Sequence, residues 1–345
     1  MMPKVSVVMS VYNSAPYLKE SIESILYQAF TDFEFIIIDD GSSDRSWEIL
    51  TEYENRDQRV RLFKNEENIG LTKSLNKGLK LAQGEYIARQ DADDVAFPER
   101  FEKQVALLDK HSEVVLTSCD IEVIDSEGHS VAKHQRACEP ELVAWYLLFY
   151  NHLAGHSQVM FRRKSVEDLG GYCETYRYCQ DYELWCRLVK VGDIVILPEV
   201  LQQQRLHSKS ISFEKSSQQT TYALSQSSHN IGELIGKELS LEELADLTRF
   251  WTGHLWWNAF PASRRVGAVH SRIKEIYQAF LQQGDQQNFS DLEMSRQLRL
   301  LIGQQFLGWI LSRRGRKSLL SKLLISLYAF RWHPSGVLEC WLKEL

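Results

Sequence analysis

The stretch FEFIIIDD, residues 33–40, joins a mostly apolar run, in which Glu34 is the one charged residue, to a pair of aspartates. A strand that is apolar on both faces is typical of the interior of a parallel sheet, which helices cover on both sides. Three further runs have the same strand-like character: VSVVMSV (5–11), RVRLF (59–63) and EYIA (85–88). The four segments therefore predict neighbouring strands of one buried sheet.

Helical patterns alternate with these strands. One extends from Tyr17 to Phe30, another begins at Ser43, a third extends from about Leu71 to Ala82, and Pro98 marks a further helix start. This alternation predicts right-handed βαβ units. The expected fold class is α/β, with a doubly wound, mostly parallel sheet and flanking helices.

Strand-like segments continue beyond the first hundred residues. VVLTSCDIEVID (114–125) and HSVAK (129–133) form an expected strand pair, and QVMFRR (158–163) and DIVIL (193–197) are further strands. A helical period from Asp181 to Val191 lies between the last two strands.

After about Ser212 the composition changes. SSQQTTYALSQSS (216–228) is polar and resembles a linker. The remainder predicts helices with Trp251, Trp256, Trp257 and Trp309 on their apolar faces. We therefore expect a first domain over residues 1–212 and a helical C-terminal region of unknown role over residues 213–345.

Composition narrows the class of protein. The chain has 345 residues, of which 44% are hydrophobic and 25% are charged, as in ordinary globular proteins. A net charge of −6 argues against a nucleic-acid-binding protein, because such binding depends on basic surfaces. Six cysteines without a CxxC pair indicate reduced thiols. Neither a secretory signal nor an apolar run of about 18 residues occurs, so we expect a cytoplasmic protein.

Polar residues gather where each of the first four strands ends. They are Tyr12 and Asn13; Asp39, Asp40, Gly41 and Asp44; Asn65, Asn68 and Gly70; and Asp91, Asp93 and Asp94. The carboxyl ends of parallel strands meet at one edge of the sheet, where ligands of such folds bind. Solvated turns are the alternative, but convergence on the binding edge favours a site.

The acidic trio, Asp91, Asp93 and Asp94, suggests the kind of ligand. Adjacent carboxylates repel one another unless a cation, hydrogen-bond donors or water relieve them. A D-x-D arrangement at a strand end suits Mg²⁺ or Mn²⁺, which leave positions open for substrate phosphates. A dehydrogenase is excluded because SVYNSAPYL has no glycine fingerprint, and a Walker-type site because no GxxxxGK(S/T) occurs.

Six segments, in this order, resemble the family 2 inverting glycosyltransferases with the GT-A fold: VSVVMSVYN, IIIDDGSSD, NIGLTKSLNKGL, GEYIARQDADD, QDYELWCRL and RLHSKSIS. The resemblance covers about residues 3–212, which it implies to be a catalytic domain. It implies transfer of a hexosyl or N-acetylhexosaminyl group from a nucleotide-diphosphate donor, foremost a UDP-sugar, to an acceptor hydroxyl with inversion. Mg²⁺ or Mn²⁺ would be the cofactor, and polysaccharide or glycoconjugate biosynthesis the process.

The resemblance also implies a role for each matching residue. The nucleotide would contact Val11, Tyr12, Asn13, Asp39, Asp40, Asn68, Gly70, Asp91 and Ala92, with Tyr12 stacked on the base and Asp40, near Asp39, at the base edge. Asp91 and Asp93 would face the ribose and diphosphate. Asp93 or Asp94 would hold the metal, with His207 closing over the metal or the diphosphate. Asp181 would be the general base, and His156 and Gln180 would line the acceptor side.

Gln180 departs from the family pattern, because relatives often carry Glu directly before the base. A glutamine still hydrogen-bonds a sugar hydroxyl but removes a charge beside Asp181. Structural roles stay open as well, with Asp181 as a helix N-cap and His207 as a hydrogen-bonding partner. For the whole chain, the alternative is a non-catalytic nucleotide-sugar-binding module. A nucleotidyltransferase is a distant third, because the expected glycine-rich basic loop is missing.

The end of the chain carries an excess of positive charge, since residues 313–345 hold seven basic and two acidic residues. In SRRGRKSLLSKLLISLYAFRW, basic residues accompany leucines. Segment 313–331 either lies on an anionic membrane as an interfacial helix or packs on the catalytic domain with a solvated basic face. The membrane version would place the protein peripherally at the inner membrane face and suit a lipid-linked acceptor; a sugar or another hydroxyl compound is the other choice.

Overall fold

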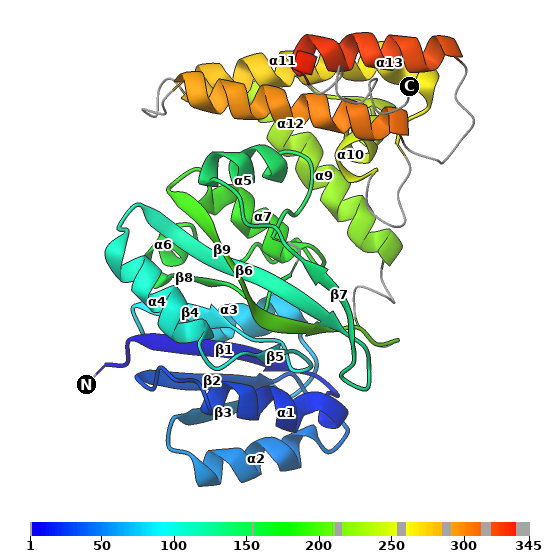
Figure 1. The fold of residues 1–345 in the computed structure, drawn as a ribbon. Coiled ribbons are helices and arrows are strands. Elements are labelled where there is room, and N and C mark those ends of the chain that lie inside the picture. The colour runs from blue at the N-terminus through cyan, green and yellow to red at the C-terminus, as the bar shows by residue number, and fades with distance from the viewer. Residues whose placement is uncertain are drawn as a thin grey trace. The chain divides into compact units, whose positions relative to one another are not determined.

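The computed structural model describes residues 2–153, 155–208, 210, 216–253, 260–284, 291–311 and 319–335. The chain divides into two compact units (Figure 1). Unit 1 comprises residues 1–147 and 151–222, and unit 2 comprises residues 148–150 and 223–345. Every residue expected to form the site belongs to unit 1.

The first half of unit 1 is a parallel sheet, as the apolar runs predict. Its strands are β1 (Val5–Val11), β2 (Phe33–Asp39), β3 (Val60–Lys64) and β4 (Tyr86–Arg89). They lie in the order β3-β2-β1-β4, all parallel. The strand order reverses between β1 and β4, so the carboxyl ends of these two strands frame the crevice where ligands bind in such sheets.

Helices cover both faces of this sheet (Figure 1). The helices α1 (Ala15–Leu26), α2 (Ser46–Arg56) and α4 (Arg100–Lys110) pack on one face, in a core with the odd-numbered side chains of β1 and β2. The helix α3 (Leu71–Leu81) packs on the other face, where a Cβ at Gly78 would come within 2.5 Å of Val8 Cγ1. All seven side chains of β2 are therefore buried, which explains why five of them are apolar.

The second half of unit 1 makes the sheet mixed. Its strands are β5 (Val95–Ala96), β6 (Val114–Ile124), β7 (Ser130–His134), β8 (Met160–Arg162) and β9 (Asp193–Arg205), and its helices include α5 (Pro140–Leu147), α6 (Arg163–Asp168) and α7 (Gln180–Leu188). The strand β8 joins the halves, antiparallel to both β4 and β6. The strand β9 is parallel to β6 and antiparallel to β5, and β7 pairs with β6. The mixed, mostly parallel sheet with flanking helices confirms the expected fold class.

Among the element boundaries that differ from the prediction, two bear on the site. The strand β9 continues well past residue 197, because its polar second part pairs with β6 although it lacks an apolar pattern. This extension carries Arg205 to the acidic trio. The helix α2 begins at Ser46 rather than Ser43, because Asp44 Oδ1 accepts a hydrogen bond from the Ser46 backbone over 2.9 Å and keeps the preceding residues in a loop.

The linker predicted at residues 216–228 is wrong, because these residues belong to the 20-residue helix α9 (Ser216–Ile235). Polar side chains, among them Gln226, Ser227 and Asn230, are buried on this helix. Gln226 Nε2 donates to Asn230 Oδ1 over 2.8 Å. The helix is hidden from pattern analysis because the hydrophobic period that normally reveals one is weak here.

Unit 2 is helical, as expected. It contains α10 (Leu241–Thr252), the 3₁₀ helix η1 (Ser263–Arg265), α11 (Val266–Gly284), α12 (Asp291–Leu311) and α13 (Leu319–Trp332). Phe250, Trp251, Phe306 and Trp309 are buried, and the rings of Phe250 and Phe306 are 4.7 Å apart. Trp256 and Trp257 lie outside the described residues. In the described part of the chain, none of the helices has the length and apolar character needed to cross a membrane.

Cys119, Cys138 and Cys173 are free thiols in the structure. Cys340 lies outside the described residues.

Candidate functional site

The strands β1 and β2 end side by side at the binding edge, where Val11 pairs with Asp39. Asn13, just beyond β1, has a left-handed φ of +50°. Its Oδ1 accepts a hydrogen bond from the backbone N–H of Ser43 over 2.8 Å, which ties the end of β1 to the loop after β2. Tyr12 is 50% exposed, so its ring is available to stack on a planar base.

Asp40 fastens the loop that follows β3. Its carboxylate accepts hydrogen bonds from Asn65 Nδ2 over 2.8 Å and from the backbone N–H groups of Ile69 and Gly70 over 3.0 and 2.9 Å. The side chain is buried. These bonds engage both carboxylate oxygens, so Asp40 holds the loop after β3 in place at the edge where a base would lie.

The same loop depends on Gly41. This residue has a φ of +74°, and a Cβ there would lie 2.7 Å from the backbone carbon of Glu67. Only glycine lets the two loops approach so closely. Asn68 is exposed on this loop and Gly70 has a φ of +93°, so the loop holds both predicted residues at the edge of the sheet.

Asp39 has the surroundings that point most directly to a ligand. Its side chain is completely buried, and neither carboxylate oxygen has a hydrogen-bond partner within the part of the chain that the structure describes. Burying unpaired carboxylate oxygens costs free energy. A ligand that donates hydrogen bonds, such as the N–H edge of a nucleobase, would remove this cost.

We expect Asp39→Asn to raise thermal stability while it weakens UDP binding. The amide keeps the shape of the side chain and removes an unpaired buried carboxylate, which should stabilise the fold by about 1 kcal/mol, or roughly 2–4 °C in Tm. Losing one acceptor for the base should weaken UDP binding about tenfold or more. Differential scanning fluorimetry and calorimetric titration measure the two effects. A variant that binds UDP as tightly as the parent would show that Asp39 does not contact the base.

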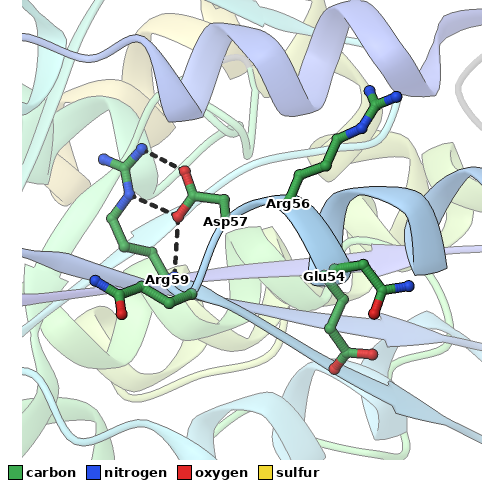
Figure 2. A pocket seen from close by; sticks show the side chains of 6 residues that line it. Glu54, Arg56, Asp57 and Arg59 are labelled. Atoms are coloured by element: carbon green, nitrogen blue, oxygen red, sulfur yellow. Dashed lines mark hydrogen bonds and ion pairs between the residues drawn. The ribbon is translucent and has the colours of Figure 1, made fainter.

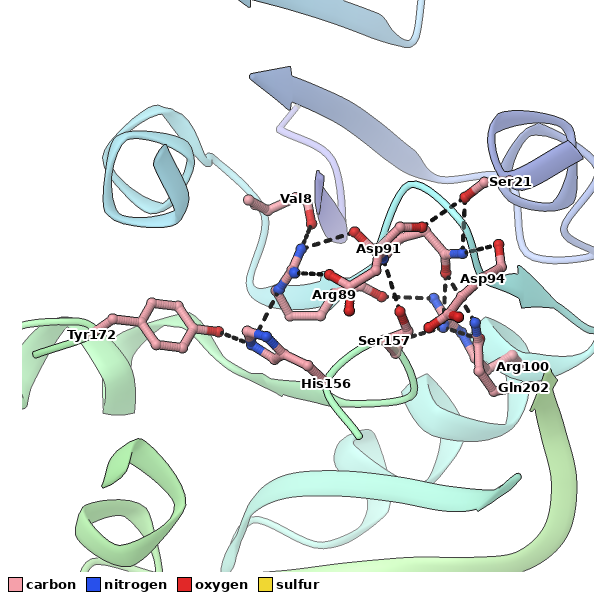
Figure 3. Close-up of polar contacts among 11 residues, drawn as sticks. Val8, Ser21, Arg89, Asp91, Asp94, Arg100, His156, Ser157, Tyr172 and Gln202 are labelled. Carbon is pink, nitrogen blue, oxygen red and sulfur yellow. Dashed lines mark hydrogen bonds and ion pairs between the residues drawn. The ribbon is translucent and has the colours of Figure 1, made fainter. Parts of the chain in front are cut away.

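Each member of the acidic trio has a different partner. Asp91 Oδ1 accepts a hydrogen bond from Arg89 Nη2 over 2.5 Å, and the backbone N–H of Asp91 donates to Ser157 Oγ over 2.8 Å (Figure 3). Arg89 is fully buried in β4, and its guanidinium also donates to the carbonyl of Val8. Burial raises the pKa of Asp91, and the positive charge of Arg89 opposes that rise. A buried arginine therefore relieves part of the crowding.

Asp93 and Asp94 face different groups. Asp94 is buried, and its Oδ1 accepts a hydrogen bond from the backbone N–H of Arg205 over 2.9 Å. Burial, followed by the charges of Asp93 and Asp91, raises the pKa of Asp94 well above its usual range. Asp93 Oδ2 instead lies 2.9 Å from His207 Nε2. Asp93 and His207 thus form a close pair, whereas the carboxylate of Asp94 contacts the backbone of Arg205.

Asp93 and His207 fit as two ligands of a divalent cation. Mg²⁺ and Mn²⁺ are often held by only one or two protein side chains, with phosphate oxygens of the substrate and water as the remaining ligands. Within the described ranges, no group of three or more His, Cys, Asp or Glu side chains could hold a metal by itself. The backbone N–H of Arg205 engages Oδ1 of Asp94, the third expected ligand, and a role of Asp94 in holding the metal stays a prediction. A cation here would depend on the phosphates of a bound nucleotide.

His156 is buried and contacts the guanidinium of Arg89. Its Nε2 lies 3.2 Å from Arg89 Nε and 2.7 Å from the Tyr172 hydroxyl (Figure 3), and its ring packs edge-on against Trp185 at 5.8 Å. Burial, followed by the charge of Arg89, lowers the pKa of His156 well below its usual value. The imidazole is therefore neutral at neutral pH and accepts a hydrogen bond from Arg89. A contact between His156 and an acceptor stays a prediction.

Asp181 lies in the first turn of α7 and is not its N-cap. Cys179 occupies the capping position with a left-handed φ of +58°. Asp181 Oδ2 accepts a hydrogen bond from Asn151 Nδ2 over 2.9 Å. Burial raises the pKa of Asp181 to about 6, hydrogen bonds from Tyr182 and Asn151 oppose the rise, and the charge of Asp91 adds to it. Asp181 is therefore mostly ionised at neutral pH yet basic enough to accept a proton, and it lies close enough to the acidic trio to sense Asp91.

We expect kcat/KM to fall as the pH drops below about 6, because protonated Asp181 cannot take a proton from an acceptor. Asn151→Ala should move this acid limb to higher pH, since the lost hydrogen bond had favoured the ionised carboxylate. Asp57→Asn, at the far edge of the sheet, should leave the limb in place. A profile that is flat between about pH 5 and pH 8, or that Asn151→Ala does not shift, would remove Asp181 from the role of base.

A recess of about 620 Å³ lies outside this site, lined by residues 54–59 (Figure 2). These residues form the last turn of α2 and the connection to β3, at the amino end of β3. Arg59 Nη2 lies 2.7 Å from Asp57 Oδ2, so two of the lining charges neutralise each other. Because ligands of doubly wound sheets bind at the carboxyl ends of the strands, we do not assign a function to this recess.

Three residues of the site were missed in the sequence: Arg89, Asn151 and Arg205. Arg89 directly follows the strand segment EYIA. A charged residue in a buried strand needs a partner of opposite charge, so Arg89 could have been predicted from the sequence. Asn151 and Arg205 carry no such signal. Their contacts to Asp181 and Asp94 join segments that are far apart in the chain.

Comparison with known proteins assigns the chain to a family. Residues 6–170 match the model of Glycosyl transferase family 2. The putative glycosyltransferase EpsE of Bacillus subtilis (strain 168) is 39% identical over 55% of this chain and 68% of its own length. The chain belongs to glycosyltransferase family 2. The amylovoran biosynthesis glycosyltransferase AmsE of Erwinia amylovora is also similar to this family 2 glycosyltransferase, with 32% identity over 59% of this chain and 76% of its own length.

Solved structures agree with the fold of this family 2 glycosyltransferase. Residues 1–349 of S. aureus TarS, in complex with UDP-GlcNAc, match with a TM-score of 0.55 and 18% identity over 86% of each chain. The mannosyltransferase PcManGT from Pyrobaculum calidifontis, in complex with GDP-Man and Mn²⁺, matches with a TM-score of 0.52 and 16% identity over 99% of this chain and 88% of its own. At these identities the likeness shows the fold alone, and it confirms the predicted GT-A architecture.

Proposed function

We propose that this family 2 glycosyltransferase moves a sugar from a nucleoside-diphosphate donor, foremost a UDP-sugar, to an acceptor hydroxyl with inversion. The observation that supports this is the placement of Asp181, whose pKa burial raises to about 6, within electrostatic reach of Asp91 at the carboxyl edge of the sheet. A single displacement needs a base near the acceptor hydroxyl and a binding site for the leaving diphosphate on the opposite side of the sugar.

The donor's base is assigned to the edge formed by Tyr12 and Asp39. The exposed Tyr12 ring offers a stacking surface, and the buried Asp39 carboxylate offers two free acceptors. The N–H of uracil suits such an acceptor, and the UDP-GlcNAc bound to TarS supports uridine and a hexosyl or N-acetylhexosaminyl group. Guanine also presents N–H donors on one edge, and GDP-Man is bound to PcManGT. Binding experiments with UDP and GDP therefore distinguish a uracil site from a guanine site.

The diphosphate is assigned to the acidic trio. Asp93 and His207 would hold Mg²⁺ or Mn²⁺, which when bound supplies the positive charge that stabilises a departing diphosphate. The Mn²⁺ in the PcManGT complex supports this choice. Arg89 donates a hydrogen bond to Asp91, which would face the ribose and diphosphate, and the backbone N–H of Arg205 donates to Asp94.

The acceptor is assigned to the start of α7. Asp181 takes the proton of the acceptor hydroxyl while the new bond to the anomeric carbon forms and the bond to the diphosphate breaks. Asn151 orients the carboxylate through its amide. Gln180 would hydrogen-bond the acceptor without adding a second charge beside the base. By analogy with AmsE, which is named for amylovoran biosynthesis, we propose a polysaccharide or glycoconjugate acceptor and a cytoplasmic reaction.

The test is a screen of the full chain against UDP-, GDP- and dTDP-sugars with Mn²⁺ and with EDTA. A true donor at about a hundred times its Kd should stabilise the fold by about 2.7 kcal/mol and, with a sugar acceptor, should release nucleoside diphosphate. Release of pyrophosphate would instead identify a nucleotidyltransferase. Absence of both stabilisation and release with every donor would contradict the proposal.

A non-catalytic nucleotide-sugar-binding module is the second candidate, favoured by Gln180 beside Asp181. It predicts stabilisation by a nucleotide sugar without release of nucleoside diphosphate. The same screen separates the two candidates.

A further inference from the structure

The helix α13 is apolar on two faces, and unit 2 covers one of them. Ile325, Ala329 and Trp332 are buried, at 0%, 0% and 7% exposure, on the face that packs within unit 2. Packing against neighbouring helices such as α12 accounts for this face. It does not account for the other.

The second face, here called the α13 apolar face, is open. It consists of Leu320, Leu323, Leu324, Leu327 and Phe330, which are 66%, 48%, 39%, 58% and 48% exposed. Their spacing of three and four residues places them in one stripe along the helix. Isolated exposed leucines are ordinary, but a stripe of five large apolar side chains is typical of a surface that binds another protein or a membrane.

Charge indicates what this surface binds. Lys322 and Arg331 are exposed on α13, and no acidic residue occurs from Leu319 to Ser335. The sequence just before the helix, RRGRK (313–317), adds further positive charge, although residues 313–318 lie outside the described residues. An apolar stripe on a helix whose charged residues are all basic matches an anionic bilayer, whose headgroups are negative and whose interior is apolar.

We propose that α13 binds the surface of an anionic phospholipid bilayer through the α13 apolar face. The helix lies in the interface, since its 14 residues are fewer than the roughly 20 that a membrane span needs. A second copy of the chain is a poorer occupant. A two-fold contact through this face would bring the same basic residues together without an acidic partner on the helix. Binding of α13 to a bilayer does not depend on which nucleotide sugar is the donor. A lipid-linked acceptor would be concentrated on the same bilayer.

The test compares binding of the full chain to vesicles of pure phosphatidylcholine and to vesicles of equal parts phosphatidylcholine and phosphatidylglycerol. We expect co-flotation with the anionic vesicles only, and weaker binding in 1 M salt, where the screening length falls to about 3 Å. The double variant Leu323→Ser with Leu327→Ser should weaken binding about tenfold or more, because two apolar side chains no longer enter the interface. Circular dichroism and Tm establish that the variants are folded.

The matched control is Leu241→Ser with Leu300→Ser, which removes two exposed leucines from α10 and α12 instead. It should bind vesicles like the parent protein. Equal binding by both double variants, or no binding by the parent protein, would overturn the proposal. Analytical ultracentrifugation covers the rival occupant, because self-association of the parent that the α13 variant loses would show that a second copy covers the face.

Discussion

Replacing Asp181 by asparagine should lower kcat by about 10²- to 10⁴-fold while leaving the Kd for UDP nearly unchanged. The amide keeps the hydrogen-bonding shape of the carboxylate, so the fold and the contact to Asn151 are retained. It cannot accept the proton of an acceptor hydroxyl at any ordinary pH. The acid limb of kcat/KM near pH 6 should disappear together with the activity, because the group that titrates there is gone.

The control for this experiment is Glu167→Gln, an exposed carboxylate on α6 that pairs with Arg163. It should retain parental turnover. Steady-state release of nucleoside diphosphate gives kcat, and calorimetry gives the Kd. Turnover of Asp181→Asn within a few-fold of the parent would reject Asp181 as the base, and a parallel loss of UDP binding would assign it to the donor site instead.

Replacing Asp93 by asparagine should have the second-largest effect, a loss of about 10²- to 10³-fold in kcat/KM together with loss of metal-dependent donor binding. Asp93 is the member of the trio that faces His207, at 2.9 Å, so it supplies the charged oxygen of the expected cation site. Titration of Mn²⁺ into the protein with UDP, followed by calorimetry, measures the coupling between metal and nucleotide.

Asp94→Asn is the matched comparison. In the parent protein, the pKa of Asp94 is raised well above the usual range, and Asp94 Oδ1 accepts a hydrogen bond from the backbone N–H of Arg205. A neutral amide should therefore replace Asp94 with a smaller loss of kcat/KM than at Asp93. If Asp94→Asn abolishes the Mn²⁺ dependence and Asp93→Asn does not, the cation ligand has been assigned to the wrong carboxylate. If neither variant alters it, the trio does not bind the metal.

Most of the fold could be predicted because burial on both faces leaves a plain pattern in a parallel sheet. In FEFIIIDD, apolar residues alternate with Glu34 only once before they fill both faces of the strand at 35–38, since α1, α2 and α4 cover one face and α3 the other. Where burial is polar, the pattern fails. The second part of β9 and the helix α9 were missed for this reason, because backbone pairing and small polar contacts hold them in place.

The candidate site was predicted in part. Motif order placed Asp39, the acidic trio and Asp181 in one site, and the structure brings Asp181 within electrostatic reach of Asp91. Motifs did not reveal how each carboxylate is held. Asp40 accepts hydrogen bonds from the loop after β3. His156 contacts the guanidinium of Arg89. Such contacts depend on side chains from distant segments, which spacing along the chain does not describe.

The sequence by itself determined the class of sheet, the family and the set of carboxylates, because periodic burial and ordered motifs are local properties of the chain. The tertiary structure alone decided the state of those carboxylates. Burial raises the pKa of Asp181 to about 6, Arg89 opposes the same effect at Asp91, and no described residue pairs with either carboxylate oxygen of Asp39. These differences arise from desolvation and from charges across the fold, and no linear pattern records either.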